Sequence, residues 1–251
     1  MNMQSPPLSE RALLVDIDGV LLIDGRIVPG TEDLAKHFAG RLALVSNNST
    51  HSAEDLCAVF VKAGVKVKPE QFFLAGMVAI KQLAHDFPGG KIVALASASI
   101  KNLLLQHGLQ ILLSHHWRKA DAVLLCRDLD VDYAKLEDAA NAALAGLPVY
   151  CANPDITHPA AQGIHLETGC LLALLKAVAP NMHVRIFGKP QPAMALAALN
   201  FLKATPSQAL FIGDNLVTDM ACAQAAGIAF WHVGGGGGLS LSQALEQLLL
   251  T

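Results

Sequence analysis

Short apolar runs alternate with longer amphipathic stretches along most of this chain. Apolar runs without helical spacing predict buried strands. These runs are residues 12–15, 42–45, 91–96, 122–126, 149–152, 184–187, 209–212 and 230–233. Helical spacing predicts helices between them, at residues 31–38, 79–85, 100–107, 133–145, 169–178 and 241–250. Strands that alternate with helices indicate an α/β fold with a mainly parallel sheet.

The middle of the chain carries such an alternation of its own. Between residues 76 and 182 the predicted strands and helices continue over a length that suits an inserted domain rather than a loop. We therefore expect a core built from residues 1–75 and 183–251, interrupted by an α/β domain at residues 76–182.

Three shorter stretches predict loops or turns. Asp24-Gly25 lies between two apolar runs and predicts a β-hairpin, which would form a small flap beside Asp16 and Asp18. The glycines at residues 234–238 lack the G-x-G-x-x-G spacing of a nucleotide loop and predict a flexible connector. His115-His116-Trp117 predicts a surface loop, because successive residues do not face one site.

Composition excludes several classes of protein. Hydrophobic residues make up 53% of the 251 residues and charged residues 16%, which excludes a disordered chain. A net charge of −3 argues against a nucleic-acid-binding surface, which needs clustered Lys and Arg.

Cysteine spacing and the N-terminus indicate a compartment. The cysteines form no Cys-x-x-Cys pair, which excludes a recognisable zinc site and indicates free thiols in a reducing cytosol. The first ten residues do not resemble a secretory signal. No apolar run approaches the roughly 20 residues that span a bilayer. We expect a soluble, cytoplasmic protein without a membrane partner.

The first apolar run ends in two carboxylates. Side chains in a strand repeat every two residues, so Asp16 and Asp18 would leave the strand end toward the same side. Two carboxylates this close repel each other unless a cation, a proton or a reacting group lies between them. The pair by itself indicates a metal site, an acid–base pair or simply an acidic turn.

Three more predicted strands end in polar residues. These ends carry Ser46 and Asn47, then Lys189, and then Asp214, Asn215 and Asp219. Ligands of open α/β sheets bind at the carboxyl ends of the strands, so we expect the four ends to converge. Carboxylates suit Mg²⁺, hydroxyl and amide groups suit phosphate oxygens, and a lysine balances negative charge.

The four strand ends together resemble a known family. Asp-x-Asp-Gly-Val, Ser-Asn-Asn-Ser-Thr, Gly-Lys-Pro and Gly-Asp-Asn-x-x-Thr-Asp are similar to the four motifs of the haloacid dehalogenase-like superfamily. Their order and spacing resemble its class IIA branch, the NagD-type phosphatases. This resemblance implies a Rossmann-like, doubly wound parallel sheet as core, with the inserted α/β domain as a cap that selects the substrate.

The resemblance also implies a phosphatase mechanism. Asp16 would attack phosphorus and form a phospho-aspartyl intermediate, and Asp18 would act as general acid and then as general base. Asp16, the carbonyl of Asp18 and Asp214 would hold Mg²⁺.

The other motif residues receive supporting roles from the same resemblance. The Ser46 hydroxyl and the Asn47 amide would hold phosphoryl oxygens, and Lys189 would neutralise charge. Asp219 would orient Lys189 or a metal-bound water, and Asn215 would flank the ligand.

One segment departs from the family pattern. Residues 165–169, His-Leu-Glu-Thr-Gly, replace the usual Pro-Gly-x-Gly, so Glu167 would repel an anionic substrate or bind a cationic part of one. Asn153-Pro154-Asp155 predicts a turn or a loop that faces the site.

The predicted function is hydrolysis of a small phosphorylated metabolite, such as a nucleotide monophosphate or a sugar phosphate. The alternatives are a phosphate-binding regulatory module on the same fold and a phosphotransferase. A homodimer is common among relatives of this branch and is a possible assembly here.

Overall fold

The computed structural model describes residues 7–23, 25–160, 162–234 and 238–250. Asp24 of the predicted hairpin and residues 235–237 of the predicted glycine connector lie outside the described residues. The chain divides into two compact units. The first contains Met1–Ser46, Ala53–Phe73 and Lys189–Thr251, and the second contains Asn47–Ser52 and Leu74–Gly188.

The first unit is built on a five-stranded sheet with β1 at its centre. The strand order is β14-β13-β1-β4-β5. β1 runs parallel to both of its neighbours, and β13 runs parallel to β14. The strands are β1 (Ala12–Asp16), β4 (Leu42–Ser46), β5 (Phe72–Leu74), β13 (Ala209–Gly213) and β14 (Ala229–His232).

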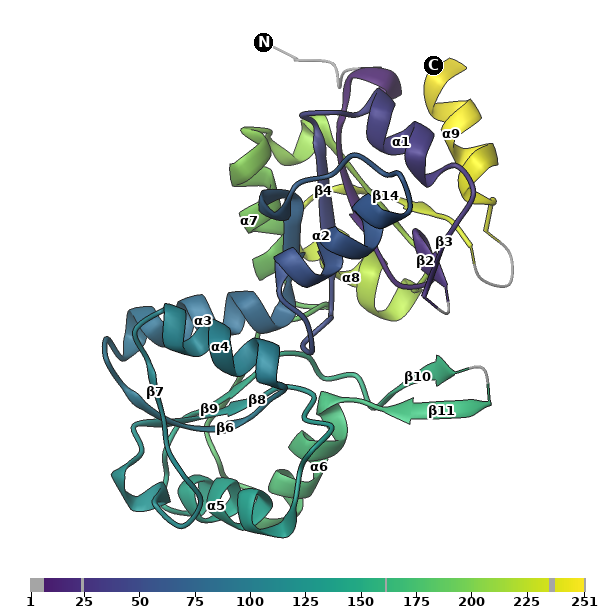
Figure 1. Ribbon diagram of the computed structural model, residues 1–251. Coiled ribbons are helices and arrows are strands. Elements are labelled where there is room, and N and C mark those ends of the chain that lie inside the picture. Colours follow the sequence, from purple (N-terminus) through teal and green to yellow (C-terminus); the bar gives the residue numbers. More distant parts are fainter. Residues whose placement is uncertain (1–6, 24, 161, 235–237, 251) are drawn as a thin grey trace. The chain divides into compact units, whose positions relative to one another are not determined.

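Helices cover this sheet on both sides, so its inner strands are buried along their whole length. Every residue of β1, β4 and β13 is buried, as expected for a parallel sheet with two covered faces. In Figure 1, α7 lies on one side of these strands and α1 and α9 on the other. The helices are α1 (Thr31–His37), α2 (Ala53–Lys62), α7 (Ala193–Leu202), α8 (Ala221–Ala225) and α9 (Leu241–Leu250). A π-helix, η5 (Leu216–Met220), precedes α8.

The second unit has a parallel five-stranded sheet of its own. Its strand order is β12-β9-β8-β6-β7. The strands are β6 (Lys91–Leu95), β7 (Gln110–Ile111), β8 (Ala122–Leu125), β9 (Val149–Cys151) and β12 (Val184–Ile186). Figure 1 shows α3 (Ala75–Asp86) and α4 (Ala98–Gln106) on one face, and α5 (Tyr133–Leu144) and α6 (Thr168–Val178) on the other. The predicted α/β fold class is confirmed.

Two antiparallel hairpins complete the structure. β2 (Leu22–Ile23) pairs with β3 (Arg26–Ile27) where the sequence predicts a flap. β10 (Thr157–Ala160) pairs with β11 (Gly163–Leu166) in the second unit, where the sequence predicts no strand. Every residue of β11 is exposed, so no alternation of buried and exposed positions marks this hairpin.

One predicted strand belongs to a different sheet from the one expected. The sequence places residues 184–187 in the core sheet, ahead of Lys189, but β12 pairs with β9 of the second unit. Val184 and Ile186 pack against the apolar cluster of that unit, which explains why the strand lies there. Lys189 therefore follows the second sheet rather than a core strand.

Candidate active site

The first strand of the core ends in two aspartates with different surroundings. Asp16 is the last residue of β1 and is buried, whereas Asp18 is exposed. One strand end therefore offers a carboxylate shielded from water and another that water reaches.

Gly19 brings a third carboxylate to this strand end. Its φ of +87° lies in the left-handed region, which favours glycine. A Cβ at this position would lie 2.1 Å from Oδ2 of Asp214, far closer than two such atoms can approach. Glycine thus lets the loop after β1 lie directly against Asp214, which follows β13.

Lys189 forms two buried ion pairs with aspartates of this cluster. Its Nζ lies 2.6 Å from Oδ1 of Asp16 and 2.6 Å from Oδ1 of Asp219. Burial opposes the charge on Lys189, but Asp16 and Asp219 outweigh this effect and raise its pKa above the usual range. The lysine is therefore a fixed positive charge at the end of β1.

The aspartates fit a divalent cation. Ligand oxygens of Asp16, Asp214 and Asp219 lie within 4.8 Å of one another. Burial raises the pKa of Asp16 and of Asp214, and repulsion from Asp219 raises both further. Lys189 supplies one positive charge against three carboxylates, so negative charge is left uncompensated. Mg²⁺ takes carboxylate oxygens, one or two from the protein, and completes its shell with water and substrate oxygens.

Asp219 already uses both carboxylate oxygens within the protein. It is fully buried in η5, and its Oδ1 faces Lys189. Its Oδ2 accepts hydrogen bonds from the backbone N–H groups of Asp214 and Asn215, each 3.1 Å away. Asp219 therefore holds Lys189 and the loop after β13, which leaves Asp16 and Asp214 as the better metal ligands of the three.

Ser46 lies at the end of β4, next to the end of β1. β1 and β4 are parallel neighbours, with Asp16 paired to Val45. The Ser46 hydroxyl is buried and donates a hydrogen bond of 3.0 Å to Oδ2 of Asp18. The structure thus brings together six of the predicted site residues: Asp16, Asp18, Ser46, Lys189, Asp214 and Asp219.

The two predicted asparagines make other contacts. Asn47 belongs to the second unit, where its carboxamide donates a hydrogen bond of 2.8 Å to Asp155. The Asn215 oxygen accepts hydrogen bonds from the N–H groups of Val217 and Thr218, at 2.9 and 3.2 Å. This side chain caps η5 and shapes the loop behind Asp214.

The sequence interpretation misses His232 as a neighbour of this cluster. Its Nε2 donates a hydrogen bond of 3.0 Å to the carbonyl oxygen of Asp214. His232 is the last residue of β14, beside the end of β13. Its position at the carboxyl end of a predicted strand is the signal that could have identified it.

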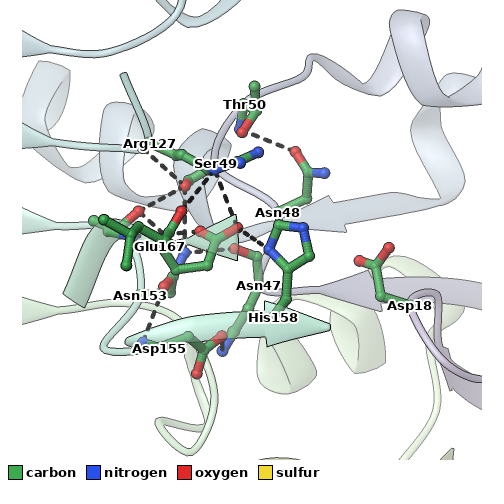
Figure 2. Close-up of polar contacts among 12 residues, drawn as sticks. Asp18, Asn47, Asn48, Ser49, Thr50, Arg127, Asn153, Asp155, His158 and Glu167 are labelled. Carbon is green, nitrogen blue, oxygen red and sulfur yellow. Dashed lines mark hydrogen bonds and ion pairs between the residues drawn. The ribbon is translucent and has the colours of Figure 1, made fainter. Parts of the chain in front are cut away.

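Glu167 of the departing segment has its charge compensated within the second unit. His158 donates a hydrogen bond of 2.7 Å to its carboxylate, and Arg127 lies 3.5 Å from it (Figure 2). Burial raises the pKa of Glu167, while Arg127 and His158 act in the opposite direction. The charge of this carboxylate is therefore compensated within the protein, and its effect on a substrate stays a prediction.

Comparisons with known proteins agree with the geometry. A family model described as haloacid dehalogenase-like hydrolase matches residues 13–110, and a second, described as HAD-hydrolase-like, matches residues 186–244. The structure of NagD from E. coli K-12 superimposes with a TM-score of 0.80 at 26% identity, over 90% of this chain and 89% of that one. The chain belongs to the class IIA haloacid dehalogenase-like hydrolases.

Two further proteins are similar to this class IIA hydrolase. A dihydroxyacetone phosphatase of Corynebacterium glutamicum is 27% identical over 223 residues, which cover 86% of this chain and 78% of the relative. A glycerol phosphate phosphatase of Mycobacterium tuberculosis, solved in complex with magnesium, has a TM-score of 0.83 at 26% identity, over 93% of this chain and 71% of that one. The class IIA hydrolase described here is accordingly a phosphatase of the haloacid dehalogenase type.

Proposed function

We propose that the protein is a Mg²⁺-dependent phosphatase that hydrolyses a small phosphomonoester through a phospho-aspartyl intermediate on Asp16. The observation that carries this proposal is the contrast between two carboxylates at one strand end. Asp16 is buried and paired with Lys189, whereas Asp18 is exposed and hydrogen-bonded to Ser46. A nucleophile must be held in one orientation, and an acid–base group must exchange protons with water and with the leaving group.

In the first half of the reaction, an oxygen of Asp16 bonds to phosphorus while the bond to the leaving alcohol breaks. Asp18 gives its proton to the departing oxygen. Lys189 holds the carboxylate of Asp16 in place and supplies positive charge beside the transferring group.

In the second half, Asp18 takes a proton from water as the water oxygen attacks phosphorus. The bond between phosphorus and Asp16 breaks, which releases inorganic phosphate and restores the Asp16 carboxylate and the protonated Asp18. When bound by Asp16, Asp214 and the carbonyl of Asp18, Mg²⁺ would neutralise charge on the phosphoryl oxygens. The Ser46 hydroxyl, fixed near Asp18, would hold one of those oxygens.

The names of the relatives support a small, oxygen-rich substrate. One relative is a dihydroxyacetone phosphatase, and a protein of similar structure is a glycerol phosphate phosphatase. We therefore include phosphorylated three-carbon compounds and sugar phosphates among the first substrates to test. The inserted segment, residues 76–182, would act as the cap that selects among them.

The alternative functions have weaker support. A regulatory phosphate-binding module would depend on the departing segment, whose Glu167 is already paired with Arg127 and His158. A phosphotransferase would differ only in the acceptor of the phosphoryl group, and no described contact favours an acceptor over water. No helix in the described part of the chain is long and apolar enough to cross a membrane.

Phosphate release from p-nitrophenyl phosphate and a metabolite panel, with Mg²⁺ or with EDTA, tests the proposal. Asp16→Asn should abolish turnover while circular dichroism and the unfolding temperature stay close to those of the wild type. Asp33→Asn is the matched control, because Asp33 is an exposed residue of α1. Undiminished turnover in Asp16→Asn would overturn the proposal.

A further inference from the structure

The chain passes between its two units beside two of the proposed active-site residues. One passage follows Ser46, and another precedes Lys189. The next residue after Ser46, Asn47, and the residue before Lys189, Gly188, both belong to the second unit. The backbone positions from which Ser46 and Lys189 project therefore depend on how the second unit holds their neighbours.

Asn47 is held at both its backbone and its side chain. Nδ2 of Asn153 donates a hydrogen bond of 2.7 Å to the Asn47 carbonyl oxygen. The Asn47 carboxamide in turn donates a hydrogen bond of 2.8 Å to Oδ2 of Asp155. Oδ1 of Asn153 accepts the backbone N–H of Asp155 at 3.1 Å, so a single turn provides both contacts (Figure 2).

Gly188 packs against the same turn. Its N–H donates a hydrogen bond of 2.6 Å to the carbonyl oxygen of Ala152, the residue before the turn. A Cβ at Gly188 would lie 2.6 Å from Oδ1 of Asn47 and 2.9 Å from Cβ of Asn153. There is no space for a side chain, so Asn47, Asn153 and Gly188 form one tightly packed cluster.

A buried polar network fixes this turn in the second unit. Asn153, Ser49 and Thr168 are almost completely buried. The hydroxyl groups of Ser49 and Thr168 are hydrogen-bonded at 2.9 Å, and the N–H of Arg127 donates to Ser49 at 3.1 Å (Figure 2). Buried polar groups that satisfy one another favour a single arrangement, because any other leaves a polar atom unpaired.

We propose that Asn153 and Asp155 are positioning residues for phosphoryl transfer, acting through Asn47 and Gly188 on Ser46 and Lys189. The proposal rests on the phosphatase function proposed above. It replaces the expectation that residues 153–155 face the ligand, since Asn153 is fully buried and hydrogen-bonded within the second unit. The groups that this turn positions hold the phosphoryl group and not the leaving group.

Because the turn positions groups that hold the phosphoryl group, the proposal predicts a specific effect on the kinetics. Asp155→Ala should lower kcat by about 10- to 100-fold, as small misplacements of catalytic groups do. The factor should be equal for p-nitrophenyl phosphate, glycerol phosphate and a sugar phosphate, whose leaving groups differ. Asp155→Asn keeps an oxygen that can accept from Asn47 and should restore most of the activity.

Asp132→Ala is the matched control in the same unit. Asp132 caps α5 through the N–H of Lys135, so its loss should lower the unfolding temperature without lowering kcat. Equal kcat in Asp155→Ala and the wild type would overturn the proposal. A loss that differs strongly among the three substrates would also overturn it, since it would place Asp155 against the leaving group.

A double-variant comparison tests the route through Asn47. If Asp155 acts through Asn47, the combined Asn47→Ala and Asp155→Ala variant should be no slower than Asn47→Ala alone, and losses that multiply would refute this route. Orthovanadate, which mimics the transferring phosphoryl group, should inhibit Asp155→Ala more weakly than the wild type. A wild-type protein without turnover would refute the phosphatase function itself, an outcome distinct from wild-type turnover with an unaffected Asp155→Ala.

Discussion

Comparing Gly19→Ala with Gly40→Ala distinguishes the effect of backbone strain from the effect of displacing a metal ligand. The new Cβ would meet Oδ2 of Asp214 at 2.1 Å, whereas ordinary contacts begin at 3.4 Å. The carboxylate must therefore move by about 1 Å, or the loop after β1 must move instead. Because Mg²⁺ requires near-ideal octahedral geometry with short metal–oxygen distances, a shift of this size removes Asp214 as a good ligand.

Gly40→Ala provides the matched control. Gly40 has a φ of +81°, close to the +87° of Gly19, but a Cβ there would meet nothing within 4 Å. Both variants place alanine in the left-handed region, which costs about 1–2 kcal/mol. For a chain of this size that cost lowers the unfolding temperature by roughly 2–8 °C, at roughly 2–4 °C for each kcal/mol.

Titration of phosphatase activity with Mg²⁺ distinguishes the two variants. We expect the Mg²⁺ concentration for half-maximal activity to rise by about 10- to 100-fold in Gly19→Ala, the range seen when groups that orient metal ligands are mutated. Gly40→Ala should keep the wild-type value despite its lower unfolding temperature. Equal Mg²⁺ dependence in both variants would refute the assignment of Asp214 as a ligand that depends on Gly19.

Three further outcomes follow from the described contacts. Lys189→Met leaves Asp16 and Asp219 without their counter-ion. The free energy of unfolding, measured with urea in metal-free buffer, should fall by about 3–5 kcal/mol, and turnover should be lost. EDTA should abolish turnover, and added Mg²⁺ should restore it, as measured by phosphate release. Asp86→Asn should lower stability to urea at pH 7 and lower it by less at pH 2, because Tyr150 and other donors hold the pKa of Asp86 below its ordinary 3.8.

The sign of the Asp86 effect follows from proton linkage. A carboxyl group whose pKa is lower in the folded state stabilises the fold above its unfolded-state pKa. That stabilisation is lost as the pH falls below about 4 toward the folded-state pKa, so wild type and Asp86→Asn should converge in acid. A difference in stability that stays constant from pH 7 to pH 2 would contradict this reasoning.

Local patterns predicted much of the fold, because most strands are continuous apolar runs. The runs at β1, β4 and β13 are buried on both faces, and each is evident in the sequence. The sheet to which β12 belongs could not be predicted, since its apolar pattern suits either sheet. Only its packing against the cluster of the second unit decides the partner.

Side-chain roles were predictable where a motif fixes the residue type, and less so where contacts decide. Asp16 and Lys189 could be paired from the motifs, and the structure places them 2.6 Å apart. The compensation of Glu167 could not be predicted, because it depends on Arg127 and on His158 of a hairpin that has no sequence signature. The local spacing of residues in a sequence does not predict ion pairs between residues that are far apart in the chain.

The attachment of residues 47–52 to the second unit has a consequence for recombination between relatives. A chimera that exchanges only residues 76–182 would combine a foreign turn at residues 152–155 with the native Asn47 and Gly188. Crossover points placed after Ser46, before Ala53, after Phe73 and before Lys189 would transfer the turn together with both of its backbone partners. We expect exchange of substrate preference with retained turnover only when these four junctions are used.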